Sequence, residues 1–197
     1  MKNFGIILGE PNSINSEILA KSIAYKKKAV IIGNYNLLKL QLKILKIKKR
    51  VKKFNKFEDF KKKANSLNVL DVPLKFKKAF SVSPKESSVY IKKCLALGHE
   101  LCLQRKIGGI INCSINKRNV FKNKNLGITE FLAKKNNIYN SEVMIIYNKK
   151  FSVVPLTTHI KVKEISKLLK KKLIINKIDT LNKFYFRYFN IRFFFYI

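Results

Sequence analysis

The sequence predicts an α/β protein, and three observations support this fold class. Short apolar runs of strand length alternate along the chain with segments whose apolar residues recur at helical spacing. Hydrophobic residues make up 47% of the 197 residues, which is enough to build a core and excludes a wholly disordered basic tail. No apolar run approaches the roughly 18 residues that a membrane-spanning helix needs. We therefore expect residues 1–197 to form a single α/β unit.

The N-terminal segment predicts a strand followed by a helix. The apolar run at residues 4–9 is strand-sized and ends in Gly-Glu-Pro, which is a turn signal. Ser13 and Ser16 are both candidate N-caps for a helix over residues 17–26. A second strand is expected at residues 29–33, where the sequence is Ala-Val-Ile-Ile-Gly.

An amphipathic helix is expected after this second strand. Its apolar stripe consists of Leu37, Leu40, Ile44 and Ile47, which recur at helical spacing. The following Lys-rich segment, residues 48–80, contains scattered Phe and Val and predicts only weak strands.

The middle of the chain gives the clearest helix signal. Ser83-Pro84-Lys85-Glu86 is a cap signature for a helix over residues 86–106. Gly108 and Gly109 end this helix and lead into a strand at residues 110–115. The expected buried stripe of the helix is Ile91, Cys94, Leu95, Gly98 and Cys102.

The C-terminal part continues the alternation of helices and strands. A turn at Gly127 precedes a short helix over residues 129–135, in which Thr129 is expected to be the cap and Glu130 to lie in the first turn. The further elements expected here are strands at 142–147 and 151–156 joined by a hairpin turn at 148–150, a long helix over 163–189, and a strand at 191–197.

The net charge of +32 allows two interpretations. Only five of the 43 basic residues are Arg, whereas sequence-specific readers of nucleic acids rely on the bidentate contacts that Arg makes and Lys does not. The chain is also rich in Ile, Asn and Phe, which share A+T-rich codons with Lys, so codon bias explains these excesses together. We therefore do not expect specific nucleic-acid binding. The alternative, a basic RNA-binding or ribosome-associated protein, predicts RNA binding that weakens steeply with salt.

Two positions are candidate binding sites on residue type alone. His159 follows two threonines at the end of an expected strand, where α/β sheets bind ligands, so it is a candidate metal ligand. His99 lies within an expected helix and is expected to be structural or simply on the surface. Lys117 ends a polar cluster after another strand, where it either holds an anion such as phosphate or is simply a solvated lysine.

Other signals are absent from the sequence. The three cysteines form no CxxC pair, so neither a disulfide framework nor a structural zinc site is expected. No signal peptide is evident, and no GxGxxG, GxxxxGK[ST], HExxH or GxSxG motif occurs. These observations predict a reduced, soluble, cytoplasmic protein.

Four segments, taken in order, resemble the 4-hydroxythreonine-4-phosphate dehydrogenase family of pyridoxal phosphate (vitamin B6) synthesis. Gly-Glu-Pro at 9–11 with Glu17 is similar to the family's GEPAGIGPE start. Residues 109–117 (GIINCSINK) resemble its strand ending in a Pro-x-x-Lys turn, with Ser114 where Pro is usual. The third segment, GITEFLA at 127–133, is similar to the family's GHTEFLA. The fourth, Val-Met at 143–144 followed by LTTHI at 156–160, is similar to its VMM…TTHIPL segment.

The resemblance implies a fold, a reaction and partners. The fold is the two-lobed, isopropylmalate-dehydrogenase-like α/β/α architecture, here incomplete because the chain ends early, so that residues 1–197 comprise the N-terminal lobe and the start of the second. The reaction is the NAD-dependent oxidation of the C3 hydroxyl of 4-phosphooxy-L-threonine, followed by loss of carbon dioxide. A divalent metal (Zn, Mg or Co) and a homodimer are implied as well. A sister dehydrogenase acting on phosphorylated four-carbon sugar acids remains an alternative.

The resemblance also implies roles for individual residues. His159 matches the first of the family's three metal-binding histidines, and Thr129 matches a substrate contact. Ile128 occupies the position of the substrate-binding His, and an isoleucine side chain cannot form that hydrogen bond. The other metal ligands and most of the NAD site lie beyond the end of this chain, so catalytic and NAD-binding residues are not assigned, and we expect impaired activity. Thr129 and His159 should face one cleft, within roughly 13 Å of each other.

Overall fold

The computed structural model describes residues 3–22, 29–60, 66–122, 127–138, 142–148, 150–157 and 160–191. The chain divides into two compact units, Met1–Asn125 and Leu126–Ile197. None of the helices in the described ranges is long and apolar enough to cross a membrane.

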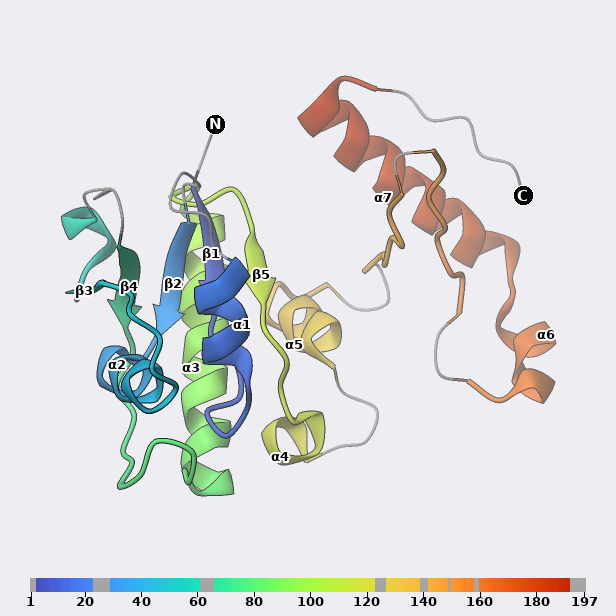
Figure 1. Ribbon diagram of the computed structural model, residues 1–197. Helices are drawn as coiled ribbons and strands as arrows, with labels where there is room; N and C mark the ends of the chain where they lie inside the picture. The colour runs from blue at the N-terminus through green and yellow to red at the C-terminus, as the bar shows by residue number, and fades with distance from the viewer. Residues whose placement is uncertain are drawn as a thin grey trace. The chain divides into compact units, whose positions relative to one another are not determined.

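A five-stranded parallel sheet forms the centre of the first unit (Figure 1). The strand order is β3-β4-β2-β1-β5, and every neighbouring pair is parallel. The strands are β1 (Phe4–Ile7), β2 (Ala29–Gly33), β3 (Val51–Phe54), β4 (Leu67–Asp71) and β5 (Ile110–Asn112). The strands expected at 4–9, 29–33 and 110–115 are therefore present, and the α/β class is confirmed.

Two strands lie in the Lys-rich segment where the sequence predicted only weak ones. β4 is apolar and buried, and it pairs with both β2 and β3. β3, with the sequence Val-Lys-Lys-Phe, lies at the edge of the sheet. An edge strand is open to solvent on one side, so its lysines can reach water. For this reason β3 does not show the continuous apolar run that is typical of a buried parallel strand.

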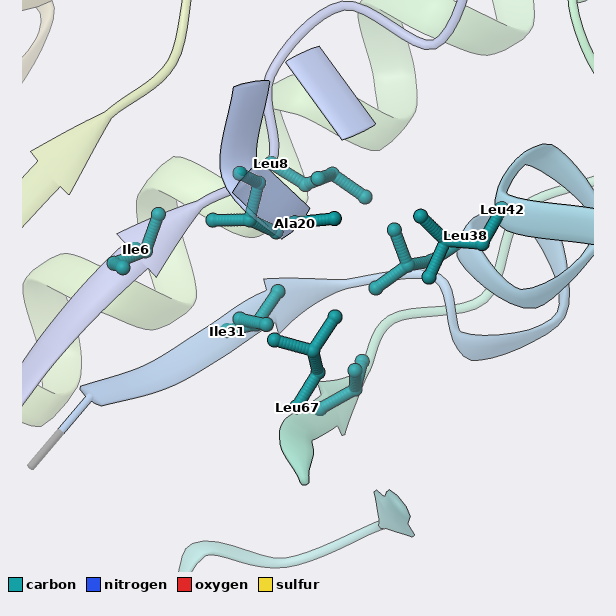
Figure 2. Packing of buried hydrophobic residues seen from close by; sticks show 9 residues of the cluster. Ile6, Leu8, Ala20, Ile31, Leu38, Leu42 and Leu67 are labelled. Carbon is teal, nitrogen blue, oxygen red and sulfur yellow. The ribbon is translucent and has the colours of Figure 1, made fainter. Parts of the chain in front are cut away.

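Helices cover both faces of this sheet. Alternate residues of β1 and β2 point to opposite faces: Ile6 and Ile31 pack with the helices α1 (Asn15–Ser22) and α2 (Tyr35–Ile44), as Figure 2 shows. Ile7 and Ile32 meet the helix α3 (Pro84–Leu103) on the other face. The unit also contains a 3-10 turn at Phe57–Asp59 and the short helix α4 (Lys117–Phe121).

The helix α3 confirms the cap signature of the sequence. Ser83 is the N-cap, its Oγ accepts a hydrogen bond from the backbone N–H of Glu86 at 3.2 Å, and Pro84 is the first helical residue. The expected stripe is buried from Ile91 to Gly98, but Cys102 is only half-buried, and Leu101 is buried instead.

The buried face of α2 differs from the expected stripe. Ile44 is 55% exposed, and the buried residues are Leu37, Leu38, Gln41 and Leu42. Gln41 occupies the core face because its amide donates to the backbone oxygens of Pro11 (2.7 Å) and Ala79 (2.9 Å). A polar side chain whose hydrogen bonds are satisfied can be buried, and hydropathy spacing does not detect this.

The second unit is mainly helical in the residues that the structure describes. Its helices are α5 (Ile128–Lys135), α6 (Ile165–Leu168) and α7 (Lys171–Phe189), with a 3-10 turn at Val162–Glu164. The strands expected at 142–147 and 151–156 are not formed in the described residues, and one isolated antiparallel bridge, Ile146 with Val153, joins the two segments. The expected strand at 191–197 lies outside the described residues apart from Ile191.

The long helix expected over residues 163–189 is interrupted. Leu169 has ψ 86° and Lys170 is extended, so α6 ends at Leu168 and α7 begins at Lys171. Leu168 and Leu169 are exposed, so no burial holds a continuous helix here. Three consecutive lysines, 170–172, add like-charge repulsion at the same point.

Candidate functional site

The carboxyl ends of β1 and β5 form the topological switch point of the sheet. The chain leaves β1 through α1 to reach β2 on one side, whereas it enters β5 from β4 through α3 on the other side. In open α/β sheets, ligands bind in the crevice where neighbouring connections diverge in this way. A ligand site is therefore expected at the segments that follow β1 and β5.

A glycine turn joins the ends of these two strands. Gly9 has φ +75°, and a Cβ at this position would lie 2.5 Å from the backbone oxygen of Ser114. The backbone N–H of Glu10 donates to that same oxygen at 3.0 Å. Both the positive φ and the close approach require glycine here.

Asn15 holds the same two segments together with its side chain. Its Nδ2 donates to the backbone oxygens of Leu8 (3.0 Å) and Ser114 (2.8 Å), and its Oδ1 accepts from Ser114 Oγ at 2.7 Å. Asn15 is buried, its bond to Leu8 is buried, and its two bonds to Ser114 are partly buried. We call this set of bonds the Asn15–Ser114 clamp. Sequence reasoning missed Asn15, because its partners lie 99 residues away or on the backbone.

The two serines proposed as caps of the first helix have different positions. Ser13 Oγ accepts from the backbone N–H of Asn15 at 3.2 Å. Asn15 is the first residue of α1 and Ile14 precedes it, so the expectation that Ser13 is the N-cap is wrong. Ser16 lies inside α1 and is buried, with no hydrogen-bond partner for its hydroxyl among the described residues.

Lys117 lies at this edge, as its place after β5 predicted. It is the first residue of α4, and it is exposed. Asn116, the N-cap of α4, donates from its backbone N–H to Glu10 Oε2 at 3.4 Å. The edge therefore carries the Glu10 carboxylate on the segment after β1 and the Lys117 ammonium group on the segment after β5.

The adjacent ends of β2 and β4 are occupied by structural bonds. The Asp71 carboxylate accepts from the backbone N–H of Tyr35 at 2.7 Å and pairs with Lys53 at 3.0 Å. Asn34 caps α2 through the backbone N–H of Leu37, and its own N–H donates to the Tyr90 hydroxyl at 2.9 Å. These polar groups are committed to the fold rather than to a ligand.

Thr129 and Ile128 lie in the first turn of α5 in the second unit. The cap is Gly127, whose N–H donates to Glu130 Oε2 at 2.8 Å, so the expectation that Thr129 caps this helix is wrong. The carboxylate folds back onto the cap because Gly127 has no Cβ, which would lie 2.6 Å from Oε2. Thr129 is the second helical residue and is exposed, while Ile128 is half-buried.

His159 lies outside the described residues, as does Thr158 before it. The expectation that Thr129 and His159 share one cleft therefore stays a prediction. His99, the other histidine, is half-buried within α3. Within the part of the chain that the structure describes, no three His, Cys, Asp or Glu side chains are grouped to hold a metal ion.

The thiol at the β5 exit is in its neutral form at neutral pH. Cys113 is half-buried, and burial raises the pKa of its thiol above the ordinary value. Burial raises the pKa of Cys94 in α3 to about 12. Neither group has the lowered pKa of a thiolate nucleophile.

Comparisons with known proteins connect this arrangement to one family. A model of the family "Pyridoxal phosphate biosynthetic protein PdxA" matches residues 25–193. The 4-hydroxythreonine-4-phosphate dehydrogenase of Aquifex aeolicus is 34% identical over 198 residues, covering 92% of this chain and 57% of its own length. The enzyme of that name from Hydrogenobaculum is 30% identical, covering 96% of this chain and 61% of its own length.

Solved structures share the fold. A 4-hydroxythreonine-4-phosphate dehydrogenase from Klebsiella pneumoniae has a TM-score of 0.81 at 20% identity, and one from Burkholderia phymatum has 0.79 at 18%. The match with the Klebsiella structure covers 95% of this chain and 60% of that one. The match with the Burkholderia structure covers 93% of this chain and 58% of that one. The chain thus spans about three-fifths of the length of the relatives that it matches.

Proposed function

This chain belongs to the PdxA family of pyridoxal phosphate biosynthetic proteins, and from this premise we propose that it serves the oxidation of 4-phosphooxy-L-threonine in vitamin B6 synthesis. The observation that carries the proposal is the family match over residues 25–193, which spans both units. The relatives bear the name of an oxidoreductase, and they give no support to the alternative of an RNA-binding or ribosome-associated protein.

The proposed reaction has two balanced steps. The C3 hydroxyl of the substrate loses its proton while the hydrogen on C3 leaves as a hydride, so the alcohol becomes a ketone. The resulting β-keto carboxylate then loses carbon dioxide, the electron pair of the broken bond passes into an enolate, and C2 takes up a proton from solvent to give the amino ketone. NAD, when bound, supplies the hydride acceptor. No residue of this chain is assigned to the NAD site.

The chain's own residues would bind and orient the substrate. The Thr129 hydroxyl is exposed at the start of α5 and is not used in the helix cap, so it is available to hydrogen-bond a substrate oxygen. Lys117 would attract the phosphate as a flexible cation. Ile128 cannot form the hydrogen bond that the family's His makes, so we expect weaker substrate binding than in relatives with that His.

Further parts of the proposal rest on the resemblance. They are a divalent metal (Zn, Mg or Co) with His159 as one ligand, a homodimer, and a cytoplasmic location. The described residues do not form a three-ligand metal group by themselves, so we assign no step to the metal.

The two histidines of the chain give a matched test of the proposal. NADH formation at 340 nm is measured with 4-phosphooxy-L-threonine, NAD and a divalent metal, and substrate binding is measured by calorimetry. We expect His159→Ala to abolish metal-dependent binding and any NADH signal, while His99→Ala leaves both unchanged. Ile128→His should tighten substrate binding about tenfold, because it restores one hydrogen-bonding group.

Two results would contradict the proposal. Equal effects of the two histidine variants would remove His159 from the site. The nucleic-acid alternative would be favoured if the Ile128→His variant bound no substrate and the chain bound RNA tightly, with the logarithm of the RNA affinity falling linearly with the logarithm of the salt concentration.

A further inference from the structure

A groove lies between the helix α2 and the edge strand β3, away from the candidate site. The two elements contact each other in the first unit (Figure 1), and β4 and β2 separate β3 from β1 in the sheet. The groove has a volume of about 380 Å³, which is within the range of small-ligand pockets. Its apolar walls are Leu40, Leu42, Ile47 and Val51. We call this feature the α2–β3 groove.

The groove is lined by apolar side chains that the core does not fully bury. Leu40 and Ile47 belong to the stripe that the sequence predicts for this helix, but both are only half-buried. The turn after α2 holds Ile47 in place, because its backbone N–H donates to the Leu42 oxygen at 2.9 Å. Lys46 in this turn has φ 56°, and its N–H donates to the Lys43 oxygen at 3.1 Å. These two bonds of a Schellman turn occupy carbonyl oxygens that would otherwise repel an anion.

Cations surround the rim of the α2–β3 groove. Lys39, Lys43 and Lys48 line it and are exposed, and no acidic side chain is among its lining residues. Residues 18–57 contain no Asp or Glu. A lysine packs its methylene stem on apolar surface while its ammonium group stays in water. The groove therefore offers apolar walls to a hydrocarbon chain and ammonium groups to an anionic head.

The lining favours a small aliphatic ligand over an aromatic ligand or a protein. The four apolar walls are all aliphatic, so no aromatic ring of the lining is available for stacking. Nine residues line the groove, whereas each partner in a stable protein interface contributes about 20–30 residues. The ligand class that matches volume, walls and rim is an alkyl chain with one negative charge.

We propose that the α2–β3 groove binds a monomeric fatty carboxylate of about eight to ten carbons, a size that suits a small pocket. Its chain lies against Leu40 and Ile47, and its carboxylate meets the ammonium groups of Lys39 and Lys43. This inference is independent of the proposed function, because it uses neither the substrate nor NAD.

Calorimetry with the full 197-residue chain tests the ligand class. Hexanoate, octanoate and decanoate are titrated below the concentrations at which they form micelles. We expect the affinity to rise by up to about fourfold for each added methylene, because the groove buries it. Octanol, which has the same chain length as octanoate but no charge, should bind about fivefold more weakly than octanoate.

Two pairs of variants locate the ligand. The double variant Lys39→Gln, Lys43→Gln should weaken octanoate binding about fivefold and leave octanol binding unchanged. Its matched control is Lys85→Gln, Lys93→Gln, since both of these lysines are exposed on α3, and it should bind octanoate within twofold of the parent chain.

The second pair tests the walls. Leu40→Trp places a larger side chain in the groove and should weaken decanoate binding at least about tenfold. Ile44→Trp is its control, because Ile44 is exposed on the same helix and does not line the groove. It should bind decanoate within twofold of the parent chain.

Several results would overturn the proposal. They are the absence of carboxylate binding, an affinity that does not depend on chain length, and equal effects of Leu40→Trp and Ile44→Trp. An equal loss of octanol and octanoate binding in the Lys39→Gln, Lys43→Gln variant would also overturn it. Binding to phosphatidylglycerol vesicles without binding to monomeric decanoate would assign the lysines to a membrane surface instead.

Discussion

At the residue scale, Asn15 decides whether the β1 and β5 ends stay together. Its amide is buried and makes three hydrogen bonds, two of them to Ser114. We expect Asn15→Ala to lower the free energy of unfolding by about 1–3 kcal/mol, because it removes the buried hydrogen bond to the Leu8 oxygen and both side-chain bonds to Ser114. Urea unfolding measures this change.

Asn112→Ala is the control for this prediction. Asn112 lies at the same strand end, but its side chain is exposed and donates only to the backbone oxygen of Cys113. Its replacement should change stability by less than about 0.5 kcal/mol. If the two variants are equally stable, the Asn15–Ser114 clamp contributes nothing measurable.

Cys94 gives the fold a pH dependence of known sign. Burial raises the pKa of its thiol from 9.0 to about 12, and burial raises the pKa of the neighbouring Tyr90 as well. Above pH 9 the unfolded chain releases the thiol proton while the folded chain keeps it, so stability falls as pH rises. The loss from one such group is about 1.4 kcal/mol per pH unit at most.

The contribution of this thiol can be isolated by replacing it. Urea unfolding at pH 8, 9 and 10 should show a steeper decline for the parent chain than for Cys94→Ala. Cys102→Ala, which removes a half-buried thiol, should change the decline less. A parent chain and a Cys94→Ala variant with the same pH slope would show that this thiol ionises equally in both states.

At the element scale, α3 packs against the sheet at Gly98. A Cβ there would lie 3.1 Å from Ile110 Cγ2 and 3.3 Å from the Cδ1 atoms of Ile7 and Ile32. We therefore expect Gly98→Val to destabilise the fold by about 1–3 kcal/mol, measured by thermal unfolding. Gly109→Val is the control, since no atom lies within 4 Å of a Cβ at that position. Equal melting temperatures for the two variants would mean that α3 can move away from the sheet without cost.

Elements with a strong local signal were predictable from the sequence. The apolar runs of β1 and β2 and the Ser-Pro cap of α3 depend on residues next to each other in the chain, so a short window contains the information. The strand β3 was not clearly predictable, because its position at the edge of the sheet removes the apolar pattern.

The residues of the candidate site likewise fall into those that local sequence predicts and those that only tertiary contacts determine. Lys117 and Thr129 were placed correctly at a strand exit and in a helix start by their neighbours in sequence. Asn15 and Gln41 were not predictable, since tertiary hydrogen bonds decide that these polar side chains are buried. Thr129 does not cap α5, because the Glu130 carboxylate accepts from the Gly127 N–H, and residue type alone favours Thr over Gly as a cap.

At the scale of the whole molecule, charge repulsion opposes folding. Eleven acidic residues can neutralise about a quarter of the 43 cations, so most lysines have no opposite charge available. Folding concentrates this charge, and salt screens it over about 10 Å at 0.1 M. We expect the melting temperature to rise when NaCl is increased from 0.05 to 0.5 M. A neutral osmolyte at equal osmolality controls for solvent effects, and a falling melting temperature would mean that ion pairs outweigh the repulsion.

The Asn15–Ser114 clamp has a consequence for the order in which the fold assembles. Its partners are 99 residues apart, so the chain must close a long loop before these bonds form. β1 can pair with β2, which is close to it in the chain. The opposite edge of β1 can pair only after the much more distant β5 has reached it. Contacts between residues far apart in the chain slow folding, because the chain loses the entropy of closing the loop before the contacts stabilise the structure. The turn at Gly9 is therefore among the last parts of the sheet to become fixed, although it follows β1, which precedes the other strands of this sheet in the chain.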